Sequence, residues 1–261
     1  MEILAYLSIM LVGIVLSVVG GGGSILTVPI FVYLFSLPAD IATSYSLFLV
    51  GVAAGVGAIQ YTKQGLVNFK IGAIFAVPAF LGVFLVRKFL MPQIPAEISL
   101  GFVSMSKDQL IMTVFAVIML AASVSMIRGR KEGESEENHP LNLPLITLEG
   151  LIVGAVTGFV GAGGGFLIIP ALVILAKIPM KEAVATSLMI ITVKSLFGFT
   201  GDIGQLPIDW PFLFITAGIS ALGILVGNRI GKHIPPGKLK KGFGYFVLLM
   251  GTIIIAQQLM Q

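Results

Sequence analysis

Long apolar stretches follow one another along almost the whole chain, with few polar residues between them. A helix needs about 20 apolar residues to cross the hydrocarbon of a bilayer. Six stretches are long enough, and they lack the period-two alternation of barrel strands, so they are predicted to be transmembrane helices. The six long stretches are residues 41–60, 70–90, 108–127, 183–200, 210–228 and 239–257, and four shorter ones are 3–19, 24–36, 147–160 and 165–176.

The four shorter stretches form two pairs, and each pair is split by glycines. The first break reads VVGGGGSILTVPIF (18–31) and the second FVGAGGGFLIIPAL (159–172). We predict an internal duplication, with a first repeat at 1–128, a polar linker at 129–146 and a second repeat at 147–261. When Pro29 is aligned with Pro170, the same constant offset matches Gly20, Gly22 and Gly23 with Gly161, Gly163 and Gly164, Pro38 with Pro179, and Gly82 with Gly223.

The basic residues indicate how the repeats are oriented. If each glycine-split pair turns back as a hairpin, twelve basic residues share one side of the membrane and three lie opposite, whereas a single crossing divides them ten to five. The positive-inside rule favours the sharper asymmetry. We therefore predict about eight transmembrane segments in two inverted repeats, with the linker in the cytoplasm and both termini outside. The twelve are Lys63, Lys70, Arg128, Arg130, Lys131, Lys177, Lys181, Arg229, Lys232, Lys238, Lys240 and Lys241.

Composition supports an integral protein of the cell membrane. Hydrophobic residues make up 57% of the 261 and charged residues only 11%, against about 25% charged in a soluble domain. The lipid bilayer is thus the predicted partner, and the dispersed net charge of +4 gives no sign of nucleic-acid binding. The N-terminal stretch has an acidic Glu2 and no basic region before it, so we interpret it as a retained helix rather than a signal peptide. The sequence leaves open whether copies of the chain form a homo-oligomer.

The glycine runs are the first candidate site. Each glycine costs a helix about 1 kcal/mol relative to alanine, and broken backbone at membrane depth is tolerated where it lines a cavity. A helix that restarts there presents free N–H groups and a positive dipole end, which suit an anion. The alternative is that the glycines serve only close helix packing. The predicted substrate-binding residues are Gly21, Gly22, Gly23 and Ser24 at the first restart, and Gly163, Gly164 and Gly165 at the second.

Lys194 is the second candidate, because we interpret it as the only basic residue well inside an apolar run. An ionisable group at membrane depth is a functional hypothesis by default. On a helix, Ser187 shares a face with Lys194 and Thr186 lies at its edge, and Ser44 opens the matching helix of the first half. Two other interpretations stay open: Lys194 reaches the interface, or it pairs with Asp202.

The sequence contains none of the motifs expected of an intramembrane enzyme. The apolar runs hold no HExxH sequence, no aspartate pair and no Ser–His pair, and no nucleotide-binding P-loop is present. Both histidines, His139 and His233, lie in polar segments. We therefore predict that the chain is not an enzyme and that it needs no cofactor or metal.

The paired breaks resemble those of the TauE/SafE family of sulfite and organosulfur anion exporters. The resemblance rests on the Gly-rich break followed by Pro in each half, and on the Ala-Thr-Ser segments at 42–44 and 185–187, and it covers nearly the whole chain. It implies a permease of about eight helices with a central anion site for sulfite, a sulfonate or a related small anion. The alternatives are an anion channel with a fixed pore, a transporter of another small organic anion, and a purely structural subunit.

Overall fold

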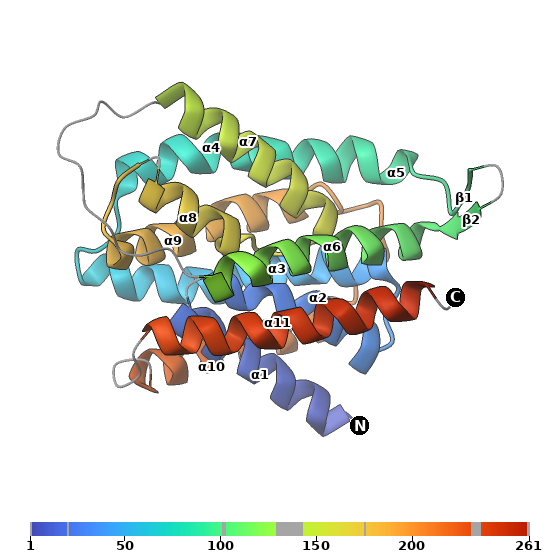
Figure 1. Ribbon diagram of the computed structural model, residues 1–261, viewed down its shortest axis with the longest axis horizontal. Coiled ribbons are helices and arrows are strands. Elements are labelled where there is room, and N and C mark those ends of the chain that lie inside the picture. The colour runs from blue at the N-terminus through green and yellow to red at the C-terminus, as the bar shows by residue number, and fades with distance from the viewer. Residues whose placement is uncertain are drawn as a thin grey trace.

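The computed structural model describes residues 2–19, 21–100, 103–128, 143–174, 176–230 and 236–259, and nearly all of them are helical (Figure 1). The first half comprises α1 (Glu2–Val19), η1 (Gly21–Leu26), α2 (Thr27–Pro29), η2 (Ile30–Leu34), α3 (Ala39–Lys63), α4 (Phe69–Leu85), η3 (Val86–Leu90), α5 (Met91–Gln93), β1 (Glu97–Leu100), β2 (Val103–Ser106) and α6 (Lys107–Arg128). The second half comprises α7 (Leu143–Val160), α8 (Gly165–Ile174), α9 (Met180–Phe199), α10 (Trp210–Ile230) and α11 (Pro236–Leu259).

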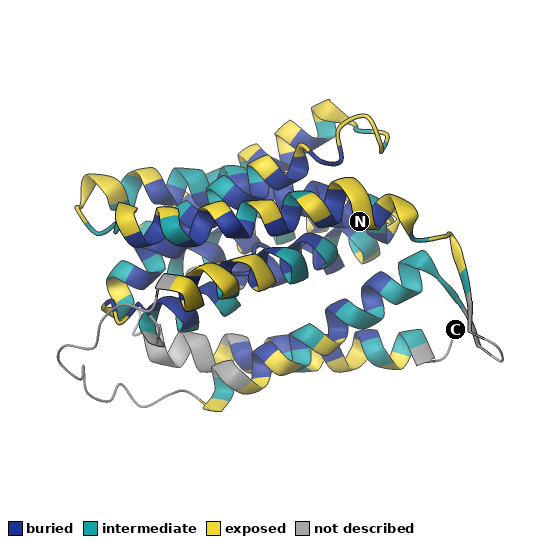
Figure 2. Ribbon diagram, turned by 90° about the horizontal axis from the view of Figure 1, so that it is seen from above, coloured by how far each residue is buried: buried dark blue, intermediate teal, exposed yellow. Residues whose placement is uncertain are grey.

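The predicted helical membrane protein is confirmed in its broad form. Within the described residues, five helices are long and apolar enough to cross a membrane, and four shorter apolar helices accompany them. Large apolar side chains are exposed on the outside of the bundle, with Ile3 79% accessible and Phe214 60% (Figure 2). Such a surface suits lipid rather than water. The five are Ala39–Lys63, Phe69–Gln93, Lys107–Val124, Met180–Phe199 and Trp210–Arg229; the sixth long stretch predicted, 239–257, falls on α11, where Gly244–Gln258 is among the shorter helices.

A short β-hairpin departs from the purely helical prediction. Strand β1 pairs with β2 in antiparallel register, with Ile98 opposite Met105. Pro92 and Pro95 precede the hairpin, and prolines end a helix because they lack an N–H and restrict the residue before them. Beyond the end of the helix, the backbone N–H and C=O groups form hydrogen bonds between β1 and β2 instead. The bundle has two ends, which we call the hairpin end, near β1 and β2, and the linker end, where α6 ends and α7 begins.

Each glycine-split segment turns back on itself. Phe35, which follows η2, packs its ring 5.4 Å from that of Tyr6 near the start of α1. In the second half, α7 ends beside the beginning of α3, where Gly161 lies against Thr43. Helix α8 then runs back to the start of α9, at the opposite end of the bundle. Both segments are therefore hairpins, which is the geometry that the charge pattern favours.

Helices α3 and α9 form the buried centre of the bundle. They run antiparallel, since Gly51 faces Leu196 while Gly57 faces Leu188. The two glycines remove side chains at the contact, so the helices approach closely. Residues of α9 thereby reach both glycine breaks.

Two outer helix pairs pack through glycines in matching ways. A Cβ added to any of these glycines would fall on the backbone of the facing helix, so only glycine permits the approach. The contacts of Gly13 and Gly223 in one pair correspond to those of Gly154 and Gly82 in the other, at the same offset that relates Pro29 to Pro170, whereas Gly150, Gly158 and Gly227 have no glycine at the corresponding position. In α1 and α10, Gly13 faces Ser220 and Gly223 faces Met10, Gly13 and Ile14; in α7 and α4, Gly154 faces Ala79 and Gly82 faces Leu151, Gly154 and Ala155.

Candidate functional site

The Lys194 side chain is completely enclosed at the centre of the bundle. Its residue accessibility is 0%, and Nζ donates a hydrogen bond to Thr157 Oγ1 of α7 over 2.7 Å. The ammonium therefore does not reach the interface. Asp202, the other partner considered from the sequence, pairs with Arg87 instead. In the described part of the chain, no carboxylate forms an ion pair with Lys194.

The second glycine break lies beside this ammonium. Residues 161–164 are not helical, and both Gly161 and Gly164 have positive φ angles, 73° and 71°, which disfavour residues with a Cβ. The Gly164 carbonyl accepts the first bonds of α8 from Leu167 and Ile168, so the helix begins at Gly165 as predicted. A Cβ built on Gly164 would lie 3.6 Å from Lys194 Nζ. The cation thus lies against the N-terminal end of α8.

The first glycine break is shaped differently. A tight 3-10 turn, η1, begins at Gly21, three residues before the restart predicted at Ser24, and Gly20 lies outside the described residues. Gly22 falls within this turn, and Gly23 packs on the backbone of Leu16. After Pro29 the chain widens into the π-turn η2, because the proline has no N–H to donate to the preceding turn.

Ser24 connects the two breaks. It is buried with 0% accessibility, and a Cβ built on Gly163 would lie 2.9 Å from its Oγ. The structure therefore brings together Ser24, Gly163, Gly164 and Lys194 from both halves of the chain, with Thr157 as a member that the sequence did not single out. We call these five residues the central site.

Thr186, Ser187 and Ser44 lie apart from the central site. Thr186 Oγ1 accepts a bond from the backbone N–H of Asn68 over 3.0 Å, and Ser187 Oγ donates to the Val184 carbonyl over 2.8 Å. Both precede Lys194 by about two helical turns, or roughly 11–12 Å along α9, toward the linker end. Ser44 lies at the other end, where its hydroxyl faces the carboxylate of Asp202.

A second buried cation, Arg87, was missed by the sequence analysis, so Lys194 is not the only basic residue at depth. Arg87 is 1% accessible and Asp202 3%, with 3.4 Å between Arg87 Nη1 and Asp202 Oδ2. Burial raises the pKa of the Asp202 carboxyl, and the guanidinium opposes that shift. The available signal was the continuation of apolar residues from Val86 to Met91 around this arginine.

The corresponding place at the linker end holds a neutral cluster. Ser17 Oγ donates to Asn228 Oδ1 over 2.6 Å, and Asn228 Nδ2 donates to Gln60 Oε1. At the offset that aligns Pro29 with Pro170, Asn228 corresponds to Arg87.

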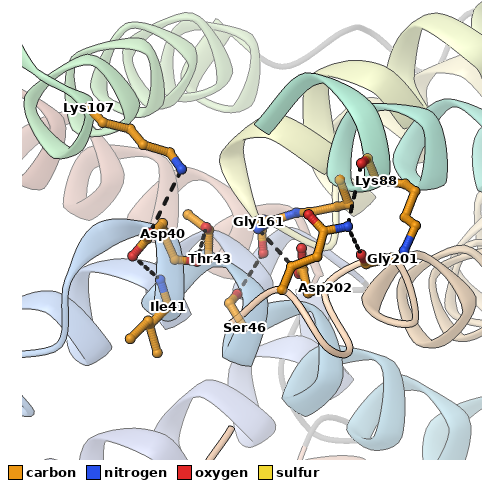
Figure 3. Close-up of polar contacts among 11 residues, drawn as sticks. Asp40, Ile41, Thr43, Ser46, Lys88, Lys107, Gly161, Gly201 and Asp202 are labelled. Atoms are coloured by element: carbon orange, nitrogen blue, oxygen red, sulfur yellow. Dashed lines mark hydrogen bonds and ion pairs between the residues drawn. The ribbon is translucent and has the colours of Figure 1, made fainter. Parts of the chain in front are cut away.

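Polar groups continue from the central site toward the hairpin end (Figure 3). Ser46 Oγ donates to the Gly161 carbonyl over 2.7 Å, which satisfies a backbone group freed by the break. Nearer the surface, Lys107 Nζ lies 3.8 Å from Asp40 Oδ2, and both side chains are partly accessible. Among the described residues, no three His, Cys, Asp or Glu side chains gather as a metal site would require.

These features define a multi-pass helical membrane protein with a buried cation at a broken helix. A family model for the sulfite exporter TauE/SafE matches residues 5–254. The chain therefore belongs to the TauE/SafE family of membrane transporters, as its motifs indicated.

Relatives found by sequence comparison carry general names. A "probable membrane transporter protein" of Xylella fastidiosa is 30% identical over 255 residues, which cover 94% of this chain and 91% of the relative. Another in Methanocaldococcus jannaschii is 26% identical over 94% of this chain and 92% of its own length. The Bacillus subtilis protein YdhB, with the same description, is 24% identical over 97% and 99%. No solved structure matches the chain significantly.

Proposed function

We propose that the protein is a secondary transporter that exports a small oxyanion, such as sulfite or a sulfonate, through the central site. The observation that carries the proposal is the enclosed ammonium of Lys194 beside the start of α8. A cation buried in the membrane without a carboxylate partner is costly. A bound anion would offset that cost.

The central site offers three kinds of donor to an oxyanion. Lys194 supplies a positive charge, and the first turn of α8 supplies N–H groups that have no partner within the helix. Ser24 and Thr157 supply hydroxyl groups, and that of Thr157, which donates to the Gly154 carbonyl in this structure, would turn toward the anion. The dipole of α8 adds to the attraction at this end. Because Gly163 and Gly164 carry no side chain, their backbone lies directly against Ser24 and Thr157.

Enclosure of the site favours a transporter over an open pore. Ser24, Thr157 and Lys194 each have 0% accessibility, whereas side chains that line an open channel would be exposed along it. Access would then alternate between the two ends. The Arg87–Asp202 contact closes the hairpin end, and the Ser17–Asn228–Gln60 cluster closes the linker end.

We also propose that the two halves are inverted repeats in the cell membrane, with the linker in the cytoplasm. An inverted repeat predicts that α1 packs on α10 as α7 packs on α4, and the contacts of Gly13 and Gly223 correspond to those of Gly154 and Gly82 at a constant offset. Transporters of this kind commonly hold substrate between their repeats. The central site, with Ser24 from one half and Lys194 from the other, has that location.

The membrane potential supports the outward direction. A cytoplasm-negative potential favours the exit of one negative charge by about 2.3 kcal/mol per 100 mV. At about 1.4 kcal/mol per tenfold, this sustains roughly a fortyfold gradient of a monovalent anion without a coupling ion. Export could therefore proceed as uniport.

The test is flux of radiolabelled sulfite, small sulfonates and carboxylates in proteoliposomes at set membrane potentials. We expect saturable, potential-sensitive flux of a sulfur anion, reduced about a hundredfold in Lys194→Met because the charge that binds the anion is gone. Lys63→Met, which removes an exposed lysine of α3, serves as the control and should keep wild-type flux. Saturable flux with trans-stimulation distinguishes a transporter from a channel. Equal flux in Lys194→Met and wild type would refute the central site.

A further inference from the structure

The guanidinium of Arg87 is buried with most of its donors unused. Its side chain has 0% accessibility, and the single ion-pair contact with Asp202 is 3.4 Å long. None of its three nitrogens has a hydrogen-bond partner in the described part of the chain, and Asp202 Oδ2 has none either. A guanidinium carries five N–H donors, and leaving buried donors unmatched costs stability.

The contact at the linker end shows that a charge is not needed to join these helices. Asn228, the counterpart of Arg87 in the second repeat, is hydrogen-bonded through its amide to Gln60 and Ser17. That cluster joins α1, α3 and α10 without any ionised group. A purely structural contact at the hairpin end could be built in the same neutral way, so the charge of Arg87 calls for another explanation.

Arg87 lies between the central site and the surface at the hairpin end. A Cβ added to Gly201 would lie 3.0 Å from the Cβ of Arg87, which places the arginine beside the turn that follows α9. The buried hydroxyl of Ser195, which has no hydrogen-bond partner among the described residues, follows Lys194 directly. Asp202 follows Ser195 by seven residues, in the turn after α9 where the backbone N–H of Asp202 donates to the Phe199 carbonyl. Beyond them lies Asp40, near both Arg87 and Asp202.

We propose that Arg87 is a second anion-binding site, at which a small oxyanion leaving the central site displaces the carboxylate of Asp202. The inference rests on the proposed function, because it places this site on the route of the same anion. A sulfite or sulfonate group offers up to three oxygens to the planar fork of N–H donors, and such bidentate contacts are the strong ones. Asp202 occupies the site in the absence of substrate, so Arg87 never faces the apolar interior unpaired.

The direct test measures anion binding to purified protein in which the central site is disabled. In the Lys194→Met background, we compare the added substitution Asp202→Asn with Asp202→Asn combined with Arg87→Gln. We follow the thermal unfolding midpoint as sulfite or methanesulfonate is added, since a ligand that binds only the folded state raises this midpoint. Chloride at equal ionic strength is the reference. Removal of the competing carboxylate should lower the half-effective sulfite concentration about tenfold relative to Lys194→Met alone, and Arg87→Gln should abolish the response. The Lys88→Gln variant, at an exposed neighbour, should leave it unchanged.

Two results would overturn the inference. One is a sulfite response no larger than that of chloride in the Asp202→Asn variant, and the other is a response that persists when Arg87 is replaced. Both results are measurements of binding and do not depend on flux. If the Lys194→Met variant still transported, the central site would be refuted, but the binding comparison of the Asp202 and Arg87 variants would still decide this inference.

A second variant covers the case in which Asp202→Asn does not fold. Arg87→Asn with Asp202→Gln introduces the residue types of the neutral pair at the linker end. If the Arg87–Asp202 pair is only structural, the double variant transports sulfite with wild-type half-saturation, and this result also overturns the inference. If Arg87 binds the anion, flux falls about tenfold while the unfolding midpoint stays at the wild-type value.

Discussion

The two ends of the bundle are closed by residues that correspond in position and differ in chemistry. At the hairpin end, Arg87 and Asp202 form a buried ion pair, whereas at the linker end Asn228 and Gln60 form an amide contact. Near these contacts, Gly198 on α9 faces Val83 on α4, and Gly57 on α3 faces Ile224 on α10. The comparison indicates that similar glycine contacts supply the packing at both ends, whereas the buried ion pair is found at the hairpin end and a neutral contact at the linker end.

The two halves of the chain also contribute different chemistry at the centre of the molecule. When the Ala-Thr-Ser segments at 42–44 and 185–187 are aligned, Lys194 on α9 corresponds to Gly51 on α3, and Gly51 packs directly on Leu196. The second break is an open loop at 161–164, whereas the first is taken up by the 3-10 turn η1. One half therefore supplies the cation and the irregular backbone, and the other supplies Ser24 and close packing.

The largest effect on stability is expected when one charge at the hairpin end is removed alone. Arg87→Met leaves Asp202 buried without its partner, which should lower the free energy of unfolding by about 3–5 kcal/mol. The matched change at the linker end, Asn228→Leu, leaves only neutral groups unpaired and should cost about 1–2 kcal/mol. Unfolding by steric trapping in nanodiscs measures both. Equal losses would show that the two ends do not differ in the way proposed.

The next effect concerns packing that the two halves share. A valine at Gly13 or at Gly154 would overlap the facing backbone of α10 or α4, so each substitution should destabilise the protein by about 1–3 kcal/mol or more, and by similar amounts. Thermal unfolding and the yield of monodisperse protein report the loss. Gly218→Val is the control, because a Cβ there meets nothing within 4 Å. A tolerant Gly13 beside an intolerant Gly154 would argue against equivalent packing.

The smallest effect should appear in flux. Thr157→Val keeps the shape of the side chain and removes the hydroxyl that contacts Lys194, so we expect sulfite flux to fall about fivefold, as for the loss of about 1 kcal/mol. Thr216→Val, which removes a buried hydroxyl bonded only to its own helix, should transport normally. A similar loss in both variants would attribute the effect to folding.

The sequence predicted those features that local patterns determine. Apolar run length identified the helices, and the distribution of lysine and arginine favoured hairpins, because both are properties of short segments and of the membrane. The glycine runs with Lys194 pointed to the residues that meet at the centre. The start of α8 at Gly165 was also predictable, since a run of glycines weakens any helix that precedes it.

Contacts between distant segments could not be predicted in the same way. Thr157 meets Lys194 because α7 packs beside α9, and no pattern within either helix encodes that choice. Asp202 was considered as a partner of Lys194, but Arg87 approaches it from the end of α4 through the space left by Gly201. The first restart begins at Gly21 rather than Ser24, because consecutive glycines can adopt a 3-10 turn and need not stay extended.

The hydrogen bond from Ser46 to the Gly161 carbonyl bears on the order in which the protein assembles. Helix α8 has 10 residues, too few to span a bilayer, and its connection to α7 exposes backbone groups that lipid cannot satisfy. The donor that satisfies one of them lies on α3, which the ribosome completes long before it reaches Gly161. We therefore expect α7 and α8 to enter the membrane together as one hairpin, against an N-terminal half that is already inserted. Synthesis of the second half without the first should leave this hairpin outside the bilayer.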